Sequence, residues 1–204
     1  DAGLLLKKEE FKLDSLLLAD AEVTLVIDSI IPSDTTDTTV NRWRITAERL
    51  DLQRVGFTLR MPQDTLGVTT YLGDARLIRG YADLGAQRYG AAQLDIRGAY
   101  AAYDATERPR TIGLDPQHIS ASNIRLLADS VRYHNGDLRV AIRQGELDER
   151  SGLSLESLTA YVHLDSTGVS VSRGSLRTTR SWIDLQARVP WAALSDRPTA
   201  DLQA

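Results

Sequence analysis

The sequence lacks several features on which common functions depend. It has no cysteine, which excludes disulfides and thiolate metal sites. No apolar run approaches the ~20 residues of a membrane-spanning helix, and no signal peptide begins the chain. There is no Gly-rich phosphate loop, no G-x-S-x-G elbow and no H-E-x-x-H motif. His118, His134 and His163 lie far apart without ligand spacing, so we expect surface histidines, no metal site and no cofactor.

Charged residues are abundant but scattered. The 24 Lys and Arg and the 28 Asp and Glu give a net charge of −4, and no basic cluster marks a nucleic-acid footprint. Asp34 and Asp37 in "SDTTDTT" lack the glycine and closing glutamate of an EF-hand loop, so a solvated loop is expected. Only the abundance of acids suggests a glycosidase role for Glu146 and Asp148. We therefore expect no enzymatic activity.

The segment "ISASNIRLLADSVRYHNGDLRVAIRQGEL" (119–147) introduces a repeated pattern. Asn135-Gly136 predicts a two-residue hairpin turn. Before the turn, the apolar positions advance in steps of two that are twice interrupted by a step of three. Similar patterns begin near residues 11, 45 and 89, and a partial copy begins near 153. Asp129 occupies a position that holds Ala21, Val55 or Ala99 in the other copies. Either Asp129 is turned outward by a bulge, or the apolar face carries an acid there.

In a strand, residues two positions apart point to the same face of the sheet, so a step of three would move the next apolar residue to the opposite face. A β-bulge keeps it on the same face, because two residues of the bulged strand then lie opposite one residue of the partner strand. We therefore expect an all-β chain of bulged strands and hairpins that forms an elongated, curved sheet with one apolar face. Residues 1–204 are interpreted as a single continuous segment of a longer protein. Helix formers near residues 3–10 are compatible with a short N-terminal helix. Return strands are expected around Val68–Leu72, Val169–Val171 and Ile183–Val189.

Several alternatives share this pattern. The line from Leu13 to Val23 resembles a leucine-rich repeat, but the asparagine position never holds Asn and the spacings of 30 to 44 residues exceed those of that class. A leucine-rich-repeat-like or β-solenoid interaction scaffold stays as an alternative, and strand addition at sheet edges is a further way to bind protein. The apolar face could be the core of a closed sandwich or the lining of an open trough. An enzyme would need clustered carboxylates on one face.

The order of several segments resembles a known family. The chain carries "ISASNIRLLADSVRY" followed by "SGLSLESLTAYVHLDSTGVSVSRGSLRTTRSWIDLQARV". Upstream it carries "LDSLLLADAEVTLVIDSIIPS", "NRWRITAERLDLQRVGFTLRMP" and "YLGDARLIRGYADLGAQRYGAAQLDIRGAYAAYD". From about Phe11 to Val189, the chain is similar to TamB-type (translocation and assembly module, AsmA-like) proteins of the Bacteroidota.

The resemblance implies a trough-like sheet, the β-taco, with an apolar interior. It also implies a parent protein that is anchored in the inner membrane and crosses the periplasm. The implied role is outer-membrane biogenesis, by bridge-like phospholipid transfer or by help in outer-membrane protein assembly with a barrel-assembly partner of the BamA/TamA type. This chain would be an internal piece without the anchor helix.

We expect acyl chains to contact one set of apolar positions, the candidate groove lining. It comprises Leu50, Leu52, Phe57, Leu59, Leu94, Ile96, Ile124, Leu126, Val131, Tyr133, Val140 and Ile142. Arg42, Arg44, Arg132, Arg139 and Arg143 are expected on the polar face, and Trp43, Trp182 and Trp191 are expected to pack in the core or at an edge.

Overall fold

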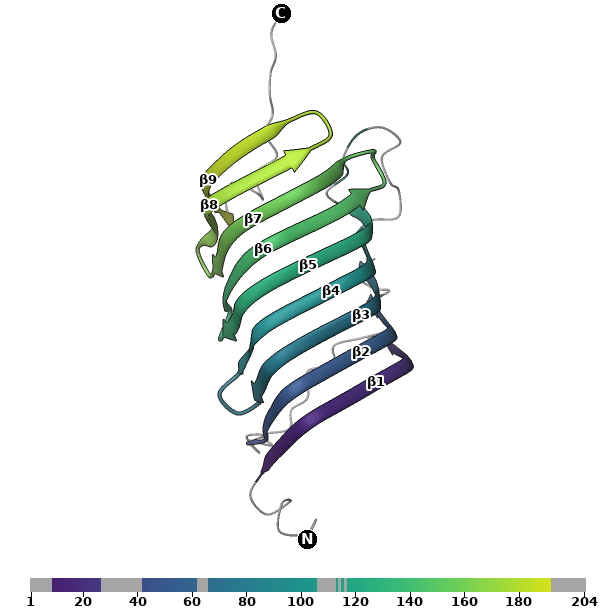
Figure 1. Ribbon diagram of the computed structural model, residues 1–204, viewed down its shortest axis with the longest axis vertical. Coiled ribbons are helices and arrows are strands. Elements are labelled where there is room, and N and C mark those ends of the chain that lie inside the picture. The colour runs from purple at the N-terminus through teal and green to yellow at the C-terminus, as the bar shows by residue number, and fades with distance from the viewer. Residues whose placement is uncertain are drawn as a thin grey trace, which may run out of the picture.

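A computed structural model describes residues 9–26, 42–61, 66–105, 113, 115 and 117–191. Every element in these residues is a β-strand, and together the strands form one open sheet (Figure 1). The strands are β1 (Glu10–Val26), β2 (Arg44–Met61), β3 (Leu66–Asp83), β4 (Arg88–Asp104), β5 (His118–His134), β6 (Asp137–Glu149), β7 (Ser154–Asp165), β8 (Gly168–Thr178) and β9 (Trp182–Pro190). The helix considered near residues 3–10 and most of the loops at 31–41 and 104–117 lie outside the described residues.

The nine strands stand side by side in sequence order, from β1 at one edge to β9 at the other (Figure 1). β1 and β2 pair in parallel, and every later neighbouring pair is antiparallel. A leucine-rich repeat or β-solenoid stacks parallel strands from successive turns. The described sheet does not have that architecture. A second sheet, which a closed sandwich would need, is also absent from the described residues.

The tight turns follow their local sequence. Asn135 and Gly136 adopt φ values of +48° and +84° between β5 and β6, as the predicted hairpin turn requires. Between β7 and β8, Asp165 Oδ1 accepts hydrogen bonds from the N–H of Thr167 at 2.7 Å and of Gly168 at 3.2 Å. Arg132 lies opposite Arg139, and Tyr133 lies opposite Leu138, which is the register that a two-residue turn at Asn135-Gly136 requires, and a register shift follows between Asp129 and Arg132.

Many steps of three contain a residue in the left-handed region, which bends the strand. Positive φ values occur inside the strands at Asp20, Arg54, Arg79, Gly98, Asn123, Ser130 and Arg173. Figure 1 shows the long strands bent rather than straight, so the sheet is curved. The interrupted period in the sequence therefore corresponds to bends that recur from strand to strand.

The predicted mechanism of these bends is wrong for the first three strands. In β1 and β2, Asp20 and Arg54 are left out of the pairing at the same level, and so are Asp14 and Glu48. At each of these levels both strands have one unpaired residue, so the register continues without a shift. There is no bulge, in which two residues of one strand would lie opposite one residue of the other. Shifts typical of bulges begin at the pairing of β4 with β5 and continue to β9.

The structure places Asp129 on the outer, polar side of the sheet. Asp129 lies opposite Gln93 and Ala141, and its carboxylate is 3.5 Å from Arg143 Nη1. Ala128, with 0% of its surface exposed, takes the apolar position instead. The left-handed residue Ser130 follows, so the second step of three in β5 runs from Ala128 to Val131, two positions later than the step from Leu126 to Asp129 that the sequence pattern assigned.

Candidate functional site: an apolar face

One face of the sheet carries unbroken rows of apolar residues that run across all nine strands. Each row follows directly from the strand register. The central row is Leu18, Leu52, Ala75, Ile96, Leu126, Gly145, Leu158, Leu176 and Ile183. A row nearer one end of the strands is Phe11, Ile45, Ala82, Tyr89, Tyr133, Leu138, Leu164, Val169 and Val189. No charged side chain interrupts either row.

The twelve positions predicted as groove lining all belong to this face, hereafter the apolar face. Leu50, Leu94 and Ile142 lie in the row that contains Ala128, and Leu52, Ile96 and Leu126 lie in the central row. The remaining six residues follow in register: Phe57 opposite Thr70, Leu59 opposite Val68, Ile124 opposite Ala99, Val131 opposite Ala91, Tyr133 opposite Tyr89 and Val140 opposite Val162.

Sequence reasoning missed much of the same face. It named no lining residue on β1, β3, β7, β8 or β9, although Leu77 lies between Leu50 and Leu94, and Leu158 follows Gly145 in the central row. The signal was available: read backwards, β3 repeats the steps of two and three of β2 at Ala82, Gly80, Leu77, Ala75, Leu72, Thr70 and Val68.

Burial on the apolar face shows that it is not a packed core within the described residues. The buried apolar residues are Ala75, Ala91, Ala99, Ala121, Ala128 and Ala160, and all of them belong to this face. Among the residues that the structure describes, no large side chain is fully buried. Phe57 and Tyr103 keep 38% and 39% of their surface exposed. A contiguous exposed apolar surface of this kind marks a binding site in soluble proteins.

A hollow of about 380 Å³ lies on the apolar face where the strands bend. On β2 its lining includes Ile45 and Ala47 before a step of three and Leu50 after it, so the hollow follows the crease between the two straight segments. Small residues leave the room: Ala47 lies opposite Gly80 on β3. The other lining residues are Leu77, Tyr81, Ala82, Tyr89, Gly90, Ala91, Leu94, Val131 and Tyr133. A volume of this size is at the lower end of small-molecule sites.

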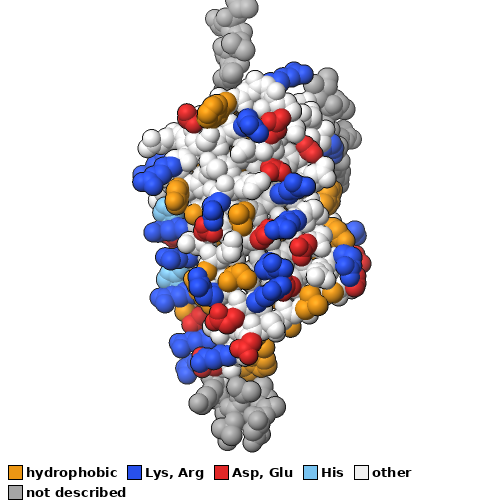
Figure 2. All heavy atoms as spheres, viewed as in Figure 1, with side chains coloured by type: hydrophobic (Ala, Val, Ile, Leu, Met, Phe, Trp, Pro, Cys, Tyr) orange, Lys and Arg blue, Asp and Glu red, His pale blue; other side chains and the backbone are white. Residues whose placement is uncertain are grey.

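The opposite face is charged. Figure 2 shows Lys and Arg interspersed with Asp and Glu over this face, with hydrophobic side chains scattered between them. Asp51 accepts hydrogen bonds from Arg49 and, at 2.7 Å, from Arg76 on the neighbouring strand. These hydrogen bonds, that from Arg49 first, lower the pKa of Asp51. The pairs link neighbouring strands and keep the face hydrated, which explains why apolar ligands are expected on the other side.

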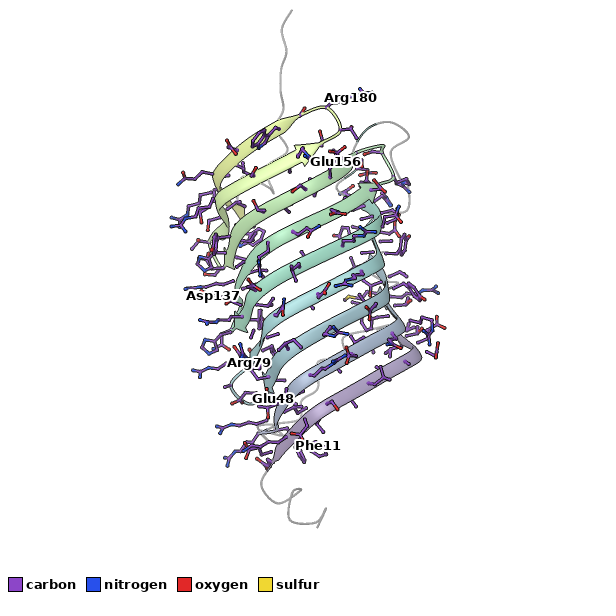
Figure 3. All side chains as sticks on the ribbon, in the orientation of Figure 1. Phe11, Glu48, Arg79, Asp137, Glu156 and Arg180 are labelled. Atoms are coloured by element: carbon purple, nitrogen blue, oxygen red, sulfur yellow. The ribbon has the colours of Figure 1, made fainter. Side chains whose placement is uncertain are left out.

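Asp137 begins β6 at an end of the sheet (Figure 3). Its carboxylate accepts hydrogen bonds from Arg139 Nε at 2.9 Å and lies 3.0 Å from His163 Nε2. Hydrogen bonding to Arg139 and then to His163 lowers the pKa of Asp137 to about 2.

The three histidines, all predicted to lie at the surface, differ in exposure. His134 is exposed as expected and His163 is half-buried, whereas His118 is only 4% exposed, with its ring 2.9 Å from Asp104, so its surface position is a wrong prediction.

A larger hollow of about 920 Å³ lies over β4 to β7 and is lined mostly by polar and charged side chains, among them Asp95, Arg97, Arg125 and Glu146. Arg97 and Arg125 are paired with Asp95 and Glu146, and the further acids of the lining, Asp148 and Glu156, are held by Asn123 and Ser154 and by Arg177. Within the described ranges, no group of three or more His, Asp or Glu side chains is placed to hold a metal ion.

The predicted tryptophan and arginine positions are mixed in outcome. Trp43 contacts Phe11, with ring centroids 6.4 Å apart, and Trp191 Nε1 donates to the carbonyl of Asp165 at 2.7 Å. Trp182 is 75% exposed and is not packed in a core. Arg132 and Arg139 lie opposite each other on the charged face, as expected.

Comparison with known proteins gives no match: no family model, no curated protein and no solved structure is similar to this chain. Among the described residues, no helix has the length and apolar character needed to cross a bilayer.

Proposed function

We propose that this chain is a non-enzymatic lipid-handling segment, and that its sheet forms a trough, or β-taco, whose apolar face conducts phospholipid acyl chains. The observation that carries the proposal is the pair of apolar rows that cross all nine strands without a charged residue. An acyl chain on such a surface meets apolar contacts at every step and never has to cross a charged barrier.

The physical chemistry of transfer requires no reacting group. Each CH₂ removed from water contributes ~0.8 kcal/mol, so a continuous apolar surface lowers the cost of carrying a lipid tail through an aqueous compartment. Contacts along the rows are alike, which lets a chain move without a deep local minimum. The charged outer face would keep the segment hydrated.

The setting of this activity follows from the family resemblance. In a TamB-type parent protein, the segment would lie in the periplasm between an inner-membrane anchor and the outer membrane. The lipid trough would then serve outer-membrane biogenesis, with a barrel-assembly protein of the BamA/TamA type as partner. A role in holding outer-membrane proteins during assembly uses the same sheet.

Photo-crosslinking tests the proposal. A photoreactive amino acid replaces Leu52 or Val131 on the apolar face, and in matched control variants it replaces Arg132 or Arg139 on the charged face. The proteins are purified from cells, irradiated and analysed by lipid extraction and native mass spectrometry. We expect phospholipid adducts at Leu52 and Val131 and none at the two arginines. Equal labelling of both faces, or no lipid at either, would refute lipid conduction, and polypeptide adducts at Leu52 would favour the scaffold role.

A further inference from the structure

The strand ends that carry the β3–β4 and β5–β6 turns form one long rim of the sheet, hereafter the turn rim. Figure 2 shows Lys and Arg gathered along the edge of the sheet at which Figure 3 labels Asp137. Because Tyr89 and Tyr133 of the apolar face lie at this end, it is an edge that a lipid on the apolar face would reach. From β2 to β7 the turn rim consists of Arg44–Thr46, Tyr81–Asp83, Arg88–Gly90, Arg132–His134, Asp137–Arg139 and His163–Asp165.

The carboxylates of the turn rim have partners, whereas two of its arginines do not. Arg88 and Arg132 make no ion pair in the part of the chain that the structure describes, since Asp83, opposite Arg88, is bonded to another arginine. The acids at this end of β1, Glu9 and Glu10, lie three strands from β4, or ~14 Å at the usual strand spacing. The partners of the three carboxylates are Arg44 for Asp83, Arg139 for Asp137, and the N–H groups of Thr167 and Gly168 for Asp165.

Arg88 and Arg132 lie diagonally across β4 and β5, because Arg88 is opposite His134 and Arg132 is opposite Gly90. Side chains in this relation are neighbours on one side of the sheet. Arg132 also lies directly opposite Arg139 on β6, and only Arg139 of the three arginines has a carboxylate partner among the described residues. Like charges so placed repel each other, and a bound anion removes that repulsion. The planar fork of an arginine binds phosphate through two parallel hydrogen bonds.

A pair of tyrosines connects these arginines to the hollow on the apolar face. Tyr89 follows Arg88 and Tyr133 follows Arg132 in the sequence, and the two ring centroids lie 5.7 Å apart. Both tyrosines line the hollow of about 380 Å³, which also contains Leu94. Tyrosine suits the boundary between an apolar surface and water, because its ring is apolar and its hydroxyl forms hydrogen bonds. An apolar hollow, an aromatic boundary and unpaired cations therefore follow one another towards the turn rim.

We propose that the apolar face holds a phospholipid in one orientation, with its headgroup phosphate bound by Arg88 and Arg132 at the turn rim and its acyl chains in the crease. This inference rests on the proposed lipid-handling function and adds the headgroup contact and the direction in which the lipid lies. Arg88 is the first residue of β4, so its long side chain can bend round the strand end towards a headgroup that protrudes past Tyr89.

The opposite rim, where β4 ends and β5 begins, is less suited to a phosphate. Tyr103 lies at this end of the apolar face, but the next residue outward is Asp104. Asp148 and Glu149 end β6 at the same rim, and their hydrogen bonds come from neutral side chains and N–H groups, so their negative charge is not compensated. Within the described ranges, these three carboxylates outnumber the two arginines at this rim, which are Arg60 and Arg150.

Isothermal titration calorimetry with soluble short-chain lipids tests the headgroup contact. The probes are dihexanoylphosphatidylglycerol, dihexanoylglycerol, which lacks the phosphate, and inorganic phosphate. We expect the wild-type chain to bind the phosphatidylglycerol about tenfold more tightly than dihexanoylglycerol, because charge-assisted hydrogen bonds add to the same tail contacts. The double variant Arg88→Gln/Arg132→Gln should lose this preference and bind dihexanoylglycerol as the wild type does. Arg60→Gln, at the opposite rim, is the matched control and should keep the preference.

The outcomes separate this inference from the lipid-handling function. Equal affinity of the wild type for the two lipids would overturn the headgroup contact alone, whereas binding of neither lipid would overturn both. A preference that the double variant retains would also overturn it. Inorganic phosphate that binds as tightly as the phosphatidylglycerol would do the same, because it would identify a site for free anions. Urea denaturation should find the double variant at least as stable as the wild type, since like charges are removed. A clear loss of stability would show that the arginines already have partners and would overturn the contact.

Photo-crosslinking with tandem mass spectrometry tests the orientation. Two phosphatidylglycerol probes carry the photoreactive group either in the headgroup or at the end of an acyl chain. We expect the headgroup probe to label residues 88–90 and 132–134, and the tail probe to label the central row around Ile96 and Leu126. Headgroup labelling of residues 102–104 or 118–120, alone or equally with the turn rim, would overturn the orientation.

Discussion

Arg54 holds Asp20 through two hydrogen bonds, Nε to Oδ1 at 2.5 Å and Nη2 to Oδ2 at 2.7 Å, at the level where β1 and β2 both bend. The two residues have nearly the same left-handed φ, +53° for Arg54 and +54° for Asp20. Hydrogen bonding to Arg54 lowers the pKa of Asp20. The two strands therefore bend at the same level of the sheet, although the residues at the bend differ. Substitutions at single positions can test these bends.

Replacing Ser130 with glycine should stabilise the chain. Ser130 has a φ of +56°, a region that costs an L-residue roughly 1–2 kcal/mol and glycine nearly nothing. After the greater entropy loss of glycine on folding, we expect Ser130→Gly to raise the free energy of unfolding by ~0.5 kcal/mol and Ser130→Val to lower it by ~2 kcal/mol. Urea denaturation measures both. Ser172→Gly, at an ordinary strand φ, is the control and should destabilise the chain. Stabilisation by valine at position 130 would contradict the bend.

The two neighbours Ala128 and Asp129 should respond in opposite ways to a change of polarity. Ala128→Asp places a carboxylate among Leu94 and Ile142 on the apolar face, and we expect a loss of roughly 2–4 kcal/mol of stability. Asp129→Ala removes an exposed ion pair with Arg143 and should cost less than ~1 kcal/mol. Equilibrium unfolding in urea compares the variants. A larger loss for Asp129→Ala would mean that Asp129 faces the apolar side.

Asp137 should make stability depend on acid pH. Its pKa in the folded chain is lowered to about 2 by Arg139 and His163, below the ordinary aspartate value of 3.8. A carboxyl with a lowered folded pKa contributes stability that is complete above its unfolded pKa and is lost as the pH falls through its folded pKa. The stability difference between wild type and Asp137→Asn should therefore shrink from pH 5 to pH 2. Chemical denaturation across this range measures it, with Asp184→Asn on β9 as control. A constant difference would exclude the proposed pairing.

Filling the crease should weaken apolar ligand binding without unfolding the sheet. Ala47→Leu adds three carbons to the hollow of about 380 Å³, next to Gly80. Displacing two or three methylenes of a bound chain from contact should lower affinity about tenfold or more. Displacement of a fluorescent fatty acid measures the affinity. Thr69→Leu, outside the hollow, is the matched control. Unchanged affinity for Ala47→Leu would move the binding site away from the crease.

The sequence by itself determined the strands and their facing. Alternation is a local property, so the apolar face could be predicted from Leu50, Leu52, Leu94 and Ile96 before any partner strand was known. The Asn135–Gly136 turn was equally local, because its backbone conformation depends on those two residues. The candidate lining residues were found for the same reason.

Only the tertiary structure decided the rest. Whether a step of three is a bulge depends on the opposing strand: Arg54 meets an extra residue at Asp20, while shifts appear only from β4 onward. The face on which Asp129 lies depends on where β5 bends, because a shift of one residue moves a side chain to the other face of the sheet. The parallel pairing of β1 with β2, and the lack of a second layer over the described apolar face, arise from contacts between distant segments. Local periodicity carries no information about those contacts.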